Sequence, residues 1–218
     1  MKYNSVVFDL DGTLLDTLGD LRDSVNYALE KNALPKRTTE EIRSFVGNGI
    51  RLLIERSVPE NSPLETVDKC FSDFKEYYKD HSAILTKPYD GIISLMKNLK
   101  SKGIKIAVVS NKADFAVKTL MEDYFSNLYD CAYGERAGVP RKPEPDGVFD
   151  AIKEMGAEIK DAVYIGDSEV DVITSKNAGL PCIAVTWGFR DKKVLESLNP
   201  EYIVDSPSDI LNIIERGI

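Results

Sequence analysis

Two aspartates stand two positions apart where an apolar stretch ends near the N-terminus. Residues 5–8 read Ser-Val-Val-Phe, a β-branched run typical of a buried strand. Asp9 follows this run directly, and Asp11 comes two residues after Asp9. Ligands of open α/β sheets bind at the carboxyl ends of strands, and alternation along an extended segment can place both carboxylates on one side, with Cα atoms about 6 to 7 Å apart. Gly12 permits a sharp turn after them. Because Asp-Gly after an apolar run is also a common turn signal, a plain turn and a catalytic carboxylate pair both stay open.

A second polar group ends the apolar run of residues 104–110. Ser110 and Asn111 precede a predicted helix at residues 113–124, so the serine hydroxyl and the free amides of a helix N-terminus could bind a phosphate. The same two side chains could equally serve as N-caps of that helix.

A single lysine lies in the segment Arg-Lys-Pro-Glu-Pro of residues 141–145. Proline fixes φ and is favoured at the first position of a helix, so the backbone around Lys142 is stiff and its ammonium could be held as a fixed cation. An exposed loop that leads into a helix would show the same pattern.

A second strand followed by acids occurs at residues 162–166, which end at Asp167, with Asp171 four residues later. This order repeats that of Asp9 and Asp11. Acids at the start of a helix also complement the helix dipole, so a purely structural role is the alternative.

Strand and helix patterns alternate through most of the chain. The predicted strands cover residues 5–8, 104–110, 162–166, 182–186 and 202–204, with a weaker one at 128–134. The predicted helices cover residues 91–102, 113–124, 145–155, 171–177 and 207–216. This alternation favours an α/β fold with a Rossmann-like, mostly parallel sheet covered on both faces.

Residues 16–86 break that alternation, because they offer amphipathic helices at 18–32, 38–46, 50–57 and 64–80 and no convincing strand. We therefore predict a core domain of residues 1–15 and 87–218 and an inserted, all-helical cap domain of residues 16–86. The segment Val-Gly-Asn-Gly at 46–49 is either a helix–helix turn or a loop over the site.

Composition limits the classes of partner. The chain has 28 basic and 36 acidic side chains and a net charge of −8, which disfavours non-specific binding of nucleic acid or anionic membranes. Its three cysteines show no CxxC spacing, and no apolar run approaches the 18 or more residues of a membrane span. No apolar signal region is visible at the N-terminus, so a cytoplasmic location is the expectation.

The segment Phe-Asp-Leu-Asp-Gly-Thr-Leu-Leu-Asp-Thr at residues 8–17 resembles the first motif of the haloacid dehalogenase (HAD) superfamily of aspartate-nucleophile phosphohydrolases. Ser110, Lys142 with its prolines, and Gly166-Asp167 resemble the later motifs of the family. A helical cap after the first strand resembles one subclass, and Val-Gly-Asn-Gly at 46–49 resembles a segment of phosphoglycolate phosphatases. The resemblance therefore covers essentially the whole chain.

This resemblance implies roles for individual residues. Asp9 would be the nucleophile that forms an aspartyl-phosphate, Asp11 the general acid and base, and Lys142 a cation that neutralises charge in the transition state. The residues implied to bind the phosphate are Ser110, Asn111, Lys142, Gly12 and Thr13. The implied metal ligands are Asp9, the backbone carbonyl of Asp11, and Asp167. Asp171 is expected to support them by hydrogen bonding, and Asn48 or Arg51 to contact a carboxylate of the substrate.

The charges of these carboxylates call for a cofactor. A pair of like charges near 4 Å costs on the order of 4 kcal/mol at an effective dielectric constant of 20, and a phosphate must bind beside them. A divalent cation removes this penalty. Oxygen-only ligands favour Mg²⁺, whereas zinc is disfavoured because the chain has no cluster of His or Cys residues.

The expected function is a Mg²⁺-dependent phosphomonoesterase that acts on a small phosphorylated metabolite similar to phosphoglycolate. A β-phosphoglucomutase-like mutase, a pyrophosphatase or nucleotidase of the same superfamily, and a non-catalytic ligand-binding member are the alternatives. Asp11 disfavours a haloacid dehalogenase, since that branch lacks the second carboxylate, and no P-loop motif supports a kinase. The sequence decides neither the physiological substrate nor whether the protein is a monomer or a homodimer.

Overall fold

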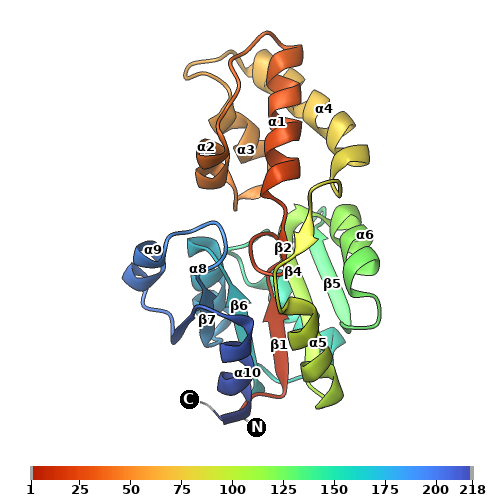
Figure 1. Ribbon diagram of the computed structural model, residues 1–218, viewed down its shortest axis with the longest axis vertical. Helices are drawn as coiled ribbons and strands as arrows, with labels where there is room; N and C mark the ends of the chain where they lie inside the picture. Colours follow the sequence, from red (N-terminus) through yellow and green to blue (C-terminus); the bar gives the residue numbers. More distant parts are fainter. Residues whose placement is uncertain (1, 217–218) are drawn as a thin grey trace. The chain divides into compact units, whose positions relative to one another are not determined.

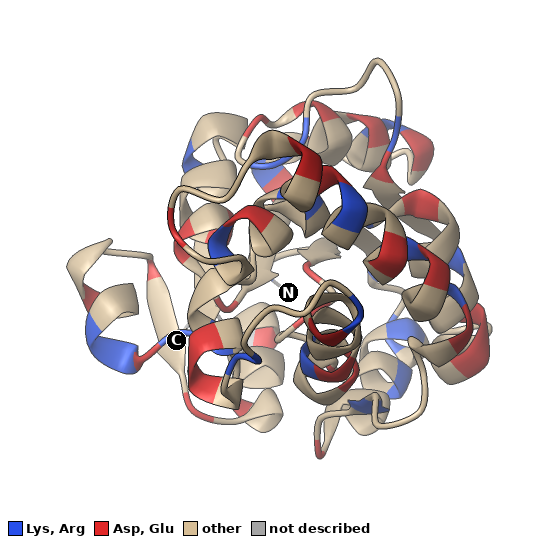
Figure 2. Ribbon diagram, turned by 90° about the horizontal axis from the view of Figure 1, so that it is seen from above, with Lys and Arg blue, Asp and Glu red and all other residues tan. Residues whose placement is uncertain are grey.

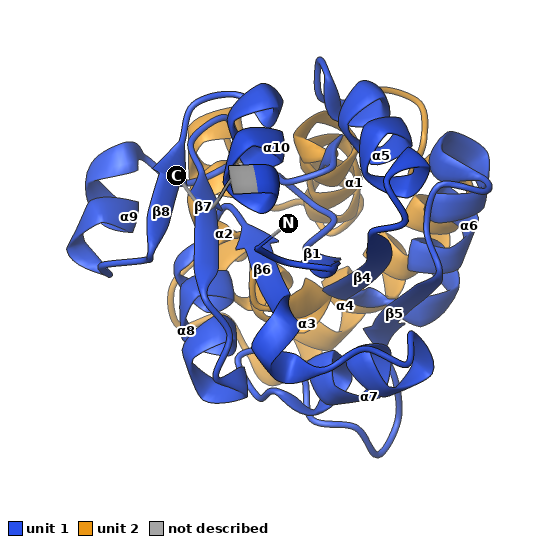
Figure 3. Cartoon of the chain, turned by 90° about the horizontal axis from the view of Figure 1, so that it is seen from below, with its two compact units in different colours: residues 1–15, 88–218 blue, residues 16–87 orange. Residues whose placement is uncertain are grey.

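The computed structural model describes residues 2–216 of the chain. These residues form two compact units, which Figure 3 distinguishes by colour: unit 1 comprises the described part of residues 1–15 and 88–218, and unit 2 comprises residues 16–87. Each unit has its own buried apolar residues.

Unit 1 is built on a six-stranded sheet in the order β5-β4-β1-β6-β7-β8, and every pair of neighbouring strands is parallel (Figure 1). The strands are β1 (Ser5–Phe8), β4 (Lys105–Ala113), β5 (Cys131–Glu135), β6 (Ala162–Gly166), β7 (Cys182–Val185) and β8 (Tyr202–Val204). Strand β1 pairs with β4 on one side and β6 on the other, so the residue that follows each strand reaches the same edge of the sheet.

Helices cover both faces of this sheet. Val6 and Phe8 of β1 belong to one apolar cluster, and Val7 belongs to the cluster on the opposite face. The first cluster includes side chains of α5 (Ile92–Ser101), α6 (Asp114–Phe125) and α10 (Pro207–Arg216). The second includes side chains of α7 (Asp146–Glu154) and α8 (Glu169–Ala178). A strand buried on both faces needs a continuous apolar run, which is why residues 5–8 are so readily assigned from sequence. The predicted α/β, Rossmann-like fold is confirmed.

Two short elements of unit 1 escape the sequence pattern. Helix α9 (Lys192–Ser197) buries only Leu195, so its sequence has no apolar periodicity. A single 3₁₀ turn, Ile159–Asp161, precedes β6 and buries none of its residues.

Unit 2 contains four helices, α1 (Leu18–Lys31), α2 (Thr39–Phe45), α3 (Gly49–Ser57) and α4 (Leu64–His81). The buried apolar side chains of α1 lie at positions 21, 25, 28 and 29, and the buried side chains of α4 lie at 67, 70, 74 and 78. These spacings give each helix one apolar face. Helix α2 begins with a capping box, in which the Thr38 side chain accepts from the Glu41 amide and Glu41 accepts from the Thr38 amide. Acidic and basic residues are interspersed along the helices (Figure 2).

The chain leaves unit 1 and returns to it through the paired two-residue strands β2 (Leu15–Asp16) and β3 (Lys87–Pro88). Within unit 2, Asp20 of α1 is 3% exposed and binds the segment that precedes β3. Its carboxylate accepts hydrogen bonds from the amides of Ile84, Leu85 and Thr86 at 2.9 to 3.1 Å and from the Thr86 hydroxyl at 2.7 Å. Among the described residues, no helix combines the length and the hydrophobicity that crossing a bilayer requires.

Candidate active site

The polar residues singled out in the sequence of unit 1 gather at the carboxyl ends of β1, β4 and β6. Asp9 follows β1, and its amide donates to the Ile165 carbonyl of β6 at 2.9 Å. Asp167 follows β6 directly, and Ser110 lies near the end of β4. Because β1 lies between β4 and β6, three segments that are distant in the sequence meet at one edge of the sheet.

Lys142 is the centre of a buried network, and only 5% of it is exposed. Its Nζ donates to Asp9 Oδ1 at 2.7 Å, to Asp171 Oδ1 at 2.8 Å and to the Tyr164 hydroxyl at 3.0 Å. An ammonium group has three hydrogens to donate, so all three are used in this network. The stiff segment predicted around Lys142 thus holds a cation between two carboxylates rather than in an exposed loop.

Asp171 is fully buried, and both of its carboxylate oxygens are occupied by hydrogen bonds. Oδ1 accepts from Lys142 and, at 3.1 Å, from the Tyr164 hydroxyl, while Oδ2 accepts from the amide and hydroxyl of Ser168 at 3.1 and 2.6 Å. This geometry supports a role in orienting Lys142 rather than in binding a metal ion. Tyr164 was not singled out from the sequence, although a tyrosine in an aliphatic strand two residues before Gly166 was the available signal.

Asp167 is 1% exposed and is held from both sides. Its Oδ2 accepts from the Phe189 amide at 2.6 Å, and its Oδ1 accepts from the Thr13 hydroxyl at 3.3 Å. A Cβ atom at Gly12, where φ is +87°, would lie 2.4 Å from Asp167 Oδ2, and one at Gly188 would lie at the same distance from that oxygen. Only glycine leaves space for the carboxylate at these two positions. Thr13 therefore contacts a predicted metal ligand, while its predicted contact with a phosphate stays a prediction.

The carboxylates of Asp9, Asp167 and Asp171 each offer an oxygen within 4.8 Å of the others. Burial, reinforced by the charge of Asp171 and opposed by Lys142, raises the pKa of Asp9 to about 7. Burial and then the charges of Asp171 and Asp9 raise the pKa of Asp167 well above its usual range. At this site, burial first and neighbouring negative charge second therefore disfavour the ionised form of both carboxyl groups. Since Asp171 is saturated by hydrogen bonds, Asp9 and Asp167 are the carboxylates that can hold a divalent cation through oxygen ligands.

The Asp11 side chain lies outside this cluster of three carboxylates. Its Oδ1 accepts from Lys112 Nζ at 2.7 Å, and the side chains of Lys112 and Asp11 are 3% and 15% exposed. Sequence reasoning assigned no role to Lys112, because a lysine after Ser-Asn gives no sign of which strand it will face.

One sequence prediction about β4 is wrong. Ser110 and Asn111 lie inside this strand, which continues to Ala113 rather than ending at residue 110, and α6 begins at Asp114, one residue after its predicted start. The strand is longer than predicted because of its tertiary contacts. Its pairing with β5 shifts register between Val109 and Ala113, which lets β4 continue past the polar residues 110–112. The Ser110 hydroxyl accepts from the Lys112 amide at 3.2 Å rather than capping the helix.

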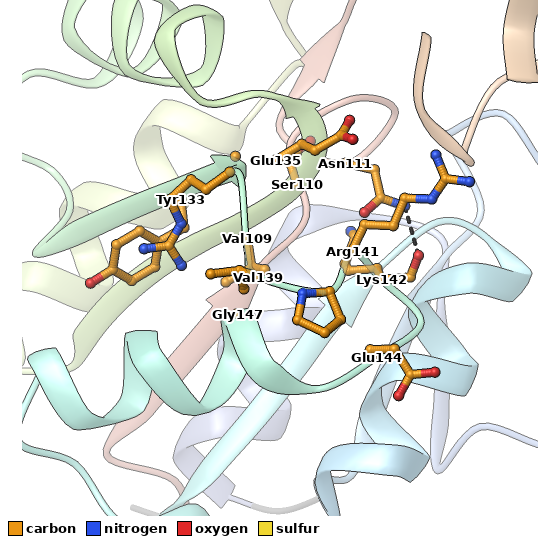
Figure 4. Close-up of a pocket in the computed structure, with 13 residues that line it drawn as sticks. Val109, Ser110, Asn111, Tyr133, Glu135, Val139, Arg141, Lys142, Glu144 and Gly147 are labelled. Atoms are coloured by element: carbon orange, nitrogen blue, oxygen red, sulfur yellow. Dashed lines mark hydrogen bonds between the residues drawn. The ribbon is translucent and has the colours of Figure 1, made fainter. Parts of the chain in front are cut away.

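A pocket opens beside these residues at the carboxyl ends of β4 and β5 (Figure 4). Ser110, Asn111 and Lys142 form part of its wall, together with Arg141 and Glu135. The Asn111 side-chain amide donates to the Lys142 carbonyl at 3.0 Å, as the hydrogen bond drawn in Figure 4 indicates. The two segments predicted to bind phosphate are therefore joined directly.

The predicted substrate-contacting residues Asn48 and Arg51 belong to unit 2. Asn48 is the N-cap of α3, and the Arg51 guanidinium forms ion pairs with Glu55 at 2.7 Å and Asp68 at 2.5 Å. These ion pairs involve Nε and Nη1 of Arg51, and the substrate-binding role of Asn48 and Arg51 stays a prediction.

The profile of the family described as "Haloacid dehalogenase-like hydrolase" matches residues 6–185. The chain belongs to this family, and it is a phosphatase-type hydrolase. It is 32% identical to "Phosphoglycolate phosphatase 1" of Pseudomonas aeruginosa over 97% of this chain and 80% of that protein. It is 33% identical to "Phosphoglycolate phosphatase" of Mesorhizobium japonicum, with 90% and 88% covered. A crystal structure from Lactobacillus delbrueckii subsp. bulgaricus, provisionally named a phosphoglycolate phosphatase, is 38% identical with a TM-score of 0.94, covering 98% of this chain and 99% of that one.

Proposed function

We propose that this protein is a Mg²⁺-dependent phosphomonoesterase that works through an aspartyl-phosphate on Asp9. The observation that carries the proposal is the contact of 2.7 Å between Asp9 Oδ1 and Lys142 Nζ, beside the carboxylate of Asp167. A nucleophilic carboxylate next to a fixed cation and a second carboxylate is suited to attack on a phosphate whose charge would be neutralised by Lys142 on one side and by a metal ion held by the two carboxylates on the other.

Residues of this chain can supply each part of the first step. An oxygen of Asp9 forms a bond to phosphorus while the bond between phosphorus and the ester oxygen breaks, and Asp11 gives a proton to the leaving oxygen. Lys142 neutralises charge on the phosphoryl group, and Ser110 and Asn111 bind its oxygens. Mg²⁺, when bound by Asp9, Asp167 and the backbone carbonyl of Asp11, would offset the charge that the carboxylates and the phosphate bring together.

The second step returns the enzyme to its starting state. Asp11, now ionised, takes a proton from water, whose oxygen attacks the phosphorus of the aspartyl-phosphate. The bond between phosphorus and Asp9 breaks, which releases inorganic phosphate and restores the Asp9 carboxylate. Tyr164 and Asp171 hold the ammonium group of Lys142 in place through both steps, because all three residues of this network are buried.

We infer that the substrate is a small phosphorylated metabolite similar to phosphoglycolate. The support is the similarity over nearly the whole chain to proteins named phosphoglycolate phosphatase. The cap role of residues 16–86, the cytoplasmic location and the monomeric or homodimeric state are further predictions.

Phosphate release from phosphoglycolate, other phosphomonoesters, pyrophosphate and β-glucose-1-phosphate, with Mg²⁺ or with a chelator, tests the proposal. We expect activity only with Mg²⁺, and a loss on the order of 10³-fold or more in Asp9→Asn. Acid quenching followed by mass spectrometry should detect a phosphorylated wild-type enzyme and none in Asp9→Asn. Asp23→Asn, which changes an exposed carboxylate of unit 2, is the matched control. Activity that persists in chelator or in Asp9→Asn would contradict the mechanism.

A further inference from the structure

Lys112 is a buried cation at the site for which the proposed mechanism has no role. Its side chain is 3% exposed, and its Nζ lies 2.7 Å from Asp11 Oδ1. Burial of an ammonium is costly unless a charged or polar partner compensates it, so such a lysine is not a neutral feature of the fold. The contact joins residues 101 positions apart in the sequence and therefore exists only because β4 lies next to β1.

Both ends of this ion pair are anchored by backbone contacts. On one side, the Lys112 amide donates to the Ser110 hydroxyl, and both residues lie between Val109 and Ala113, which pair with β5. On the other side, Asp11 forms a bridge with Leu15, and the Gly12 amide donates to the Leu15 carbonyl at 2.8 Å. A short charged hydrogen bond between two anchored segments fixes the direction of the Asp11 side chain.

The contact uses one oxygen of Asp11 and leaves the other available. Lys112 contacts Oδ1, and among the described residues no group donates a hydrogen bond to Asp11 Oδ2. An oxygen with no partner at the edge of the sheet is free to exchange a proton with a substrate. The carboxylate is thus held at one oxygen while the other remains open for chemistry.

We propose that Lys112 is a positioning residue for Asp11, which it holds with Oδ2 ready to give a proton to the leaving oxygen. This inference rests on the proposed function, because it assumes that Asp11 is the general acid. Orientation of a catalytic group within a few tenths of an ångström is a large part of its effect, so loss of the ion pair should impair proton transfer specifically.

The leaving group separates this role from a merely structural one. An alkyl phosphate needs a proton on its leaving oxygen as the bond to phosphorus breaks, whereas p-nitrophenolate leaves readily without one. The value of kcat/KM reports the steps up to formation of the aspartyl-phosphate for both esters. The ratio of the two kcat/KM values does not depend on how much of a variant is correctly folded.

The experiment compares phosphoglycolate with p-nitrophenyl phosphate at saturating Mg²⁺ for the wild type, Lys112→Met, Lys112→Arg and Asp11→Asn. For Lys112→Met we expect kcat/KM to fall about 10²-fold with phosphoglycolate and by less than about threefold with the aryl ester. Lys112→Arg, which keeps the charge, should recover part of the loss. Adding Lys112→Met to Asp11→Asn should cause no further loss with phosphoglycolate. Lys118→Met, at an exposed lysine of α6, is the control and should leave both values unchanged.

Three results would overturn the proposal: an equal loss with both esters in Lys112→Met, no loss with either, or additive losses in the double variant. If Asp11→Asn changes the ratio and Lys112→Met does not, only the role of Lys112 fails. If Asp11→Asn itself keeps the wild-type ratio, or the wild type releases no phosphate with Mg²⁺, the proposed acid–base function fails and the role of Lys112 fails with it.

Discussion

Binding of Mg²⁺ to this protein should strengthen as the pH rises from 5 to 8. The metal ion needs ionised carboxylates, and burial raises the pKa of Asp9 to about 7 in the metal-free protein. Below pH 7, each unit by which the pH falls leaves about ten times less ionised Asp9. The apparent affinity for Mg²⁺ should therefore fall about tenfold per unit of decreasing pH for this group alone. The raised pKa of Asp167 acts in the same direction and makes the dependence steeper.

The same shift fixes the sign of the effect on stability. An aspartate whose pKa is raised to about 7 in the folded protein binds more protons there than in the unfolded chain, where its pKa is about 3.9. Without metal, Asp9 therefore lowers the free energy of unfolding as the pH rises from about 4 to about 7, and changes it no further above that range. Mg²⁺ should reverse this loss, so the increase in Tm that it causes should be small at pH 5.5 and larger at pH 8.

Isothermal titration calorimetry at several pH values, in two buffers with different ionisation enthalpies, measures the affinity and the protons released together. Proton release should be detectable at pH 6 and should decrease toward pH 8. Asp9→Asn should bind Mg²⁺ more weakly and with a shallower pH dependence, whereas Asp23→Asn should match the wild type. An affinity that is equal at pH 6 and pH 8, or proton uptake on binding, would refute the reasoning.

Two further predictions concern stability and the space around the predicted metal ligand Asp167. Asp20→Ala removes the acceptor of three backbone amides and one hydroxyl, so it should lower the free energy of unfolding by about 2–4 kcal/mol in urea titrations. The control Asp23→Ala should lower it by about 0.5 kcal/mol or less, and equal effects of the two variants would count against the assigned hydrogen bonds. Gly12→Ala should lower both Mg²⁺ affinity and kcat/KM at least about tenfold, because its Cβ would lie 2.4 Å from Asp167 Oδ2. Gly138→Ala is the control for backbone strain alone, since φ there is +80°, close to the +87° of Gly12, and no atom lies within 4 Å of the added Cβ. Similar activity losses in the two glycine variants would mean that strain, not the clash, is responsible.

The sequence was most informative where local pattern and tertiary environment agree. β1 could be predicted because it is buried on both faces, and the position of Asp9 follows from where that apolar run stops. The end of β4 could not be predicted, since Ser-Asn-Lys resembles a strand terminus and only pairing with β5 extends the strand to Ala113. Helix α9 was missed for the opposite reason, because it buries one side chain and therefore has no pattern.

Side-chain direction was the main limit for the site. Sequence patterns bring Asp11 and β4 to the same edge of the sheet, but they do not show that Lys112 turns toward Asp11. The contact of the Phe189 amide with Asp167 is equally invisible, since a backbone donor leaves no trace in residue type. Tyr164 could have been found, because its hydroxyl needs a partner in a strand that is otherwise aliphatic.

The paired strands β2 and β3 have a consequence for how the sequence of such a protein can evolve. Residues 16–87 begin and end next to each other, so this continuous segment can be replaced by another of different length without redirecting the chain on either side. Asp9, Lys142 and Asp167 all lie outside it. Under the proposed function, new substrate ranges can therefore arise by exchange of one module while the residues proposed to cleave the phosphate ester remain untouched.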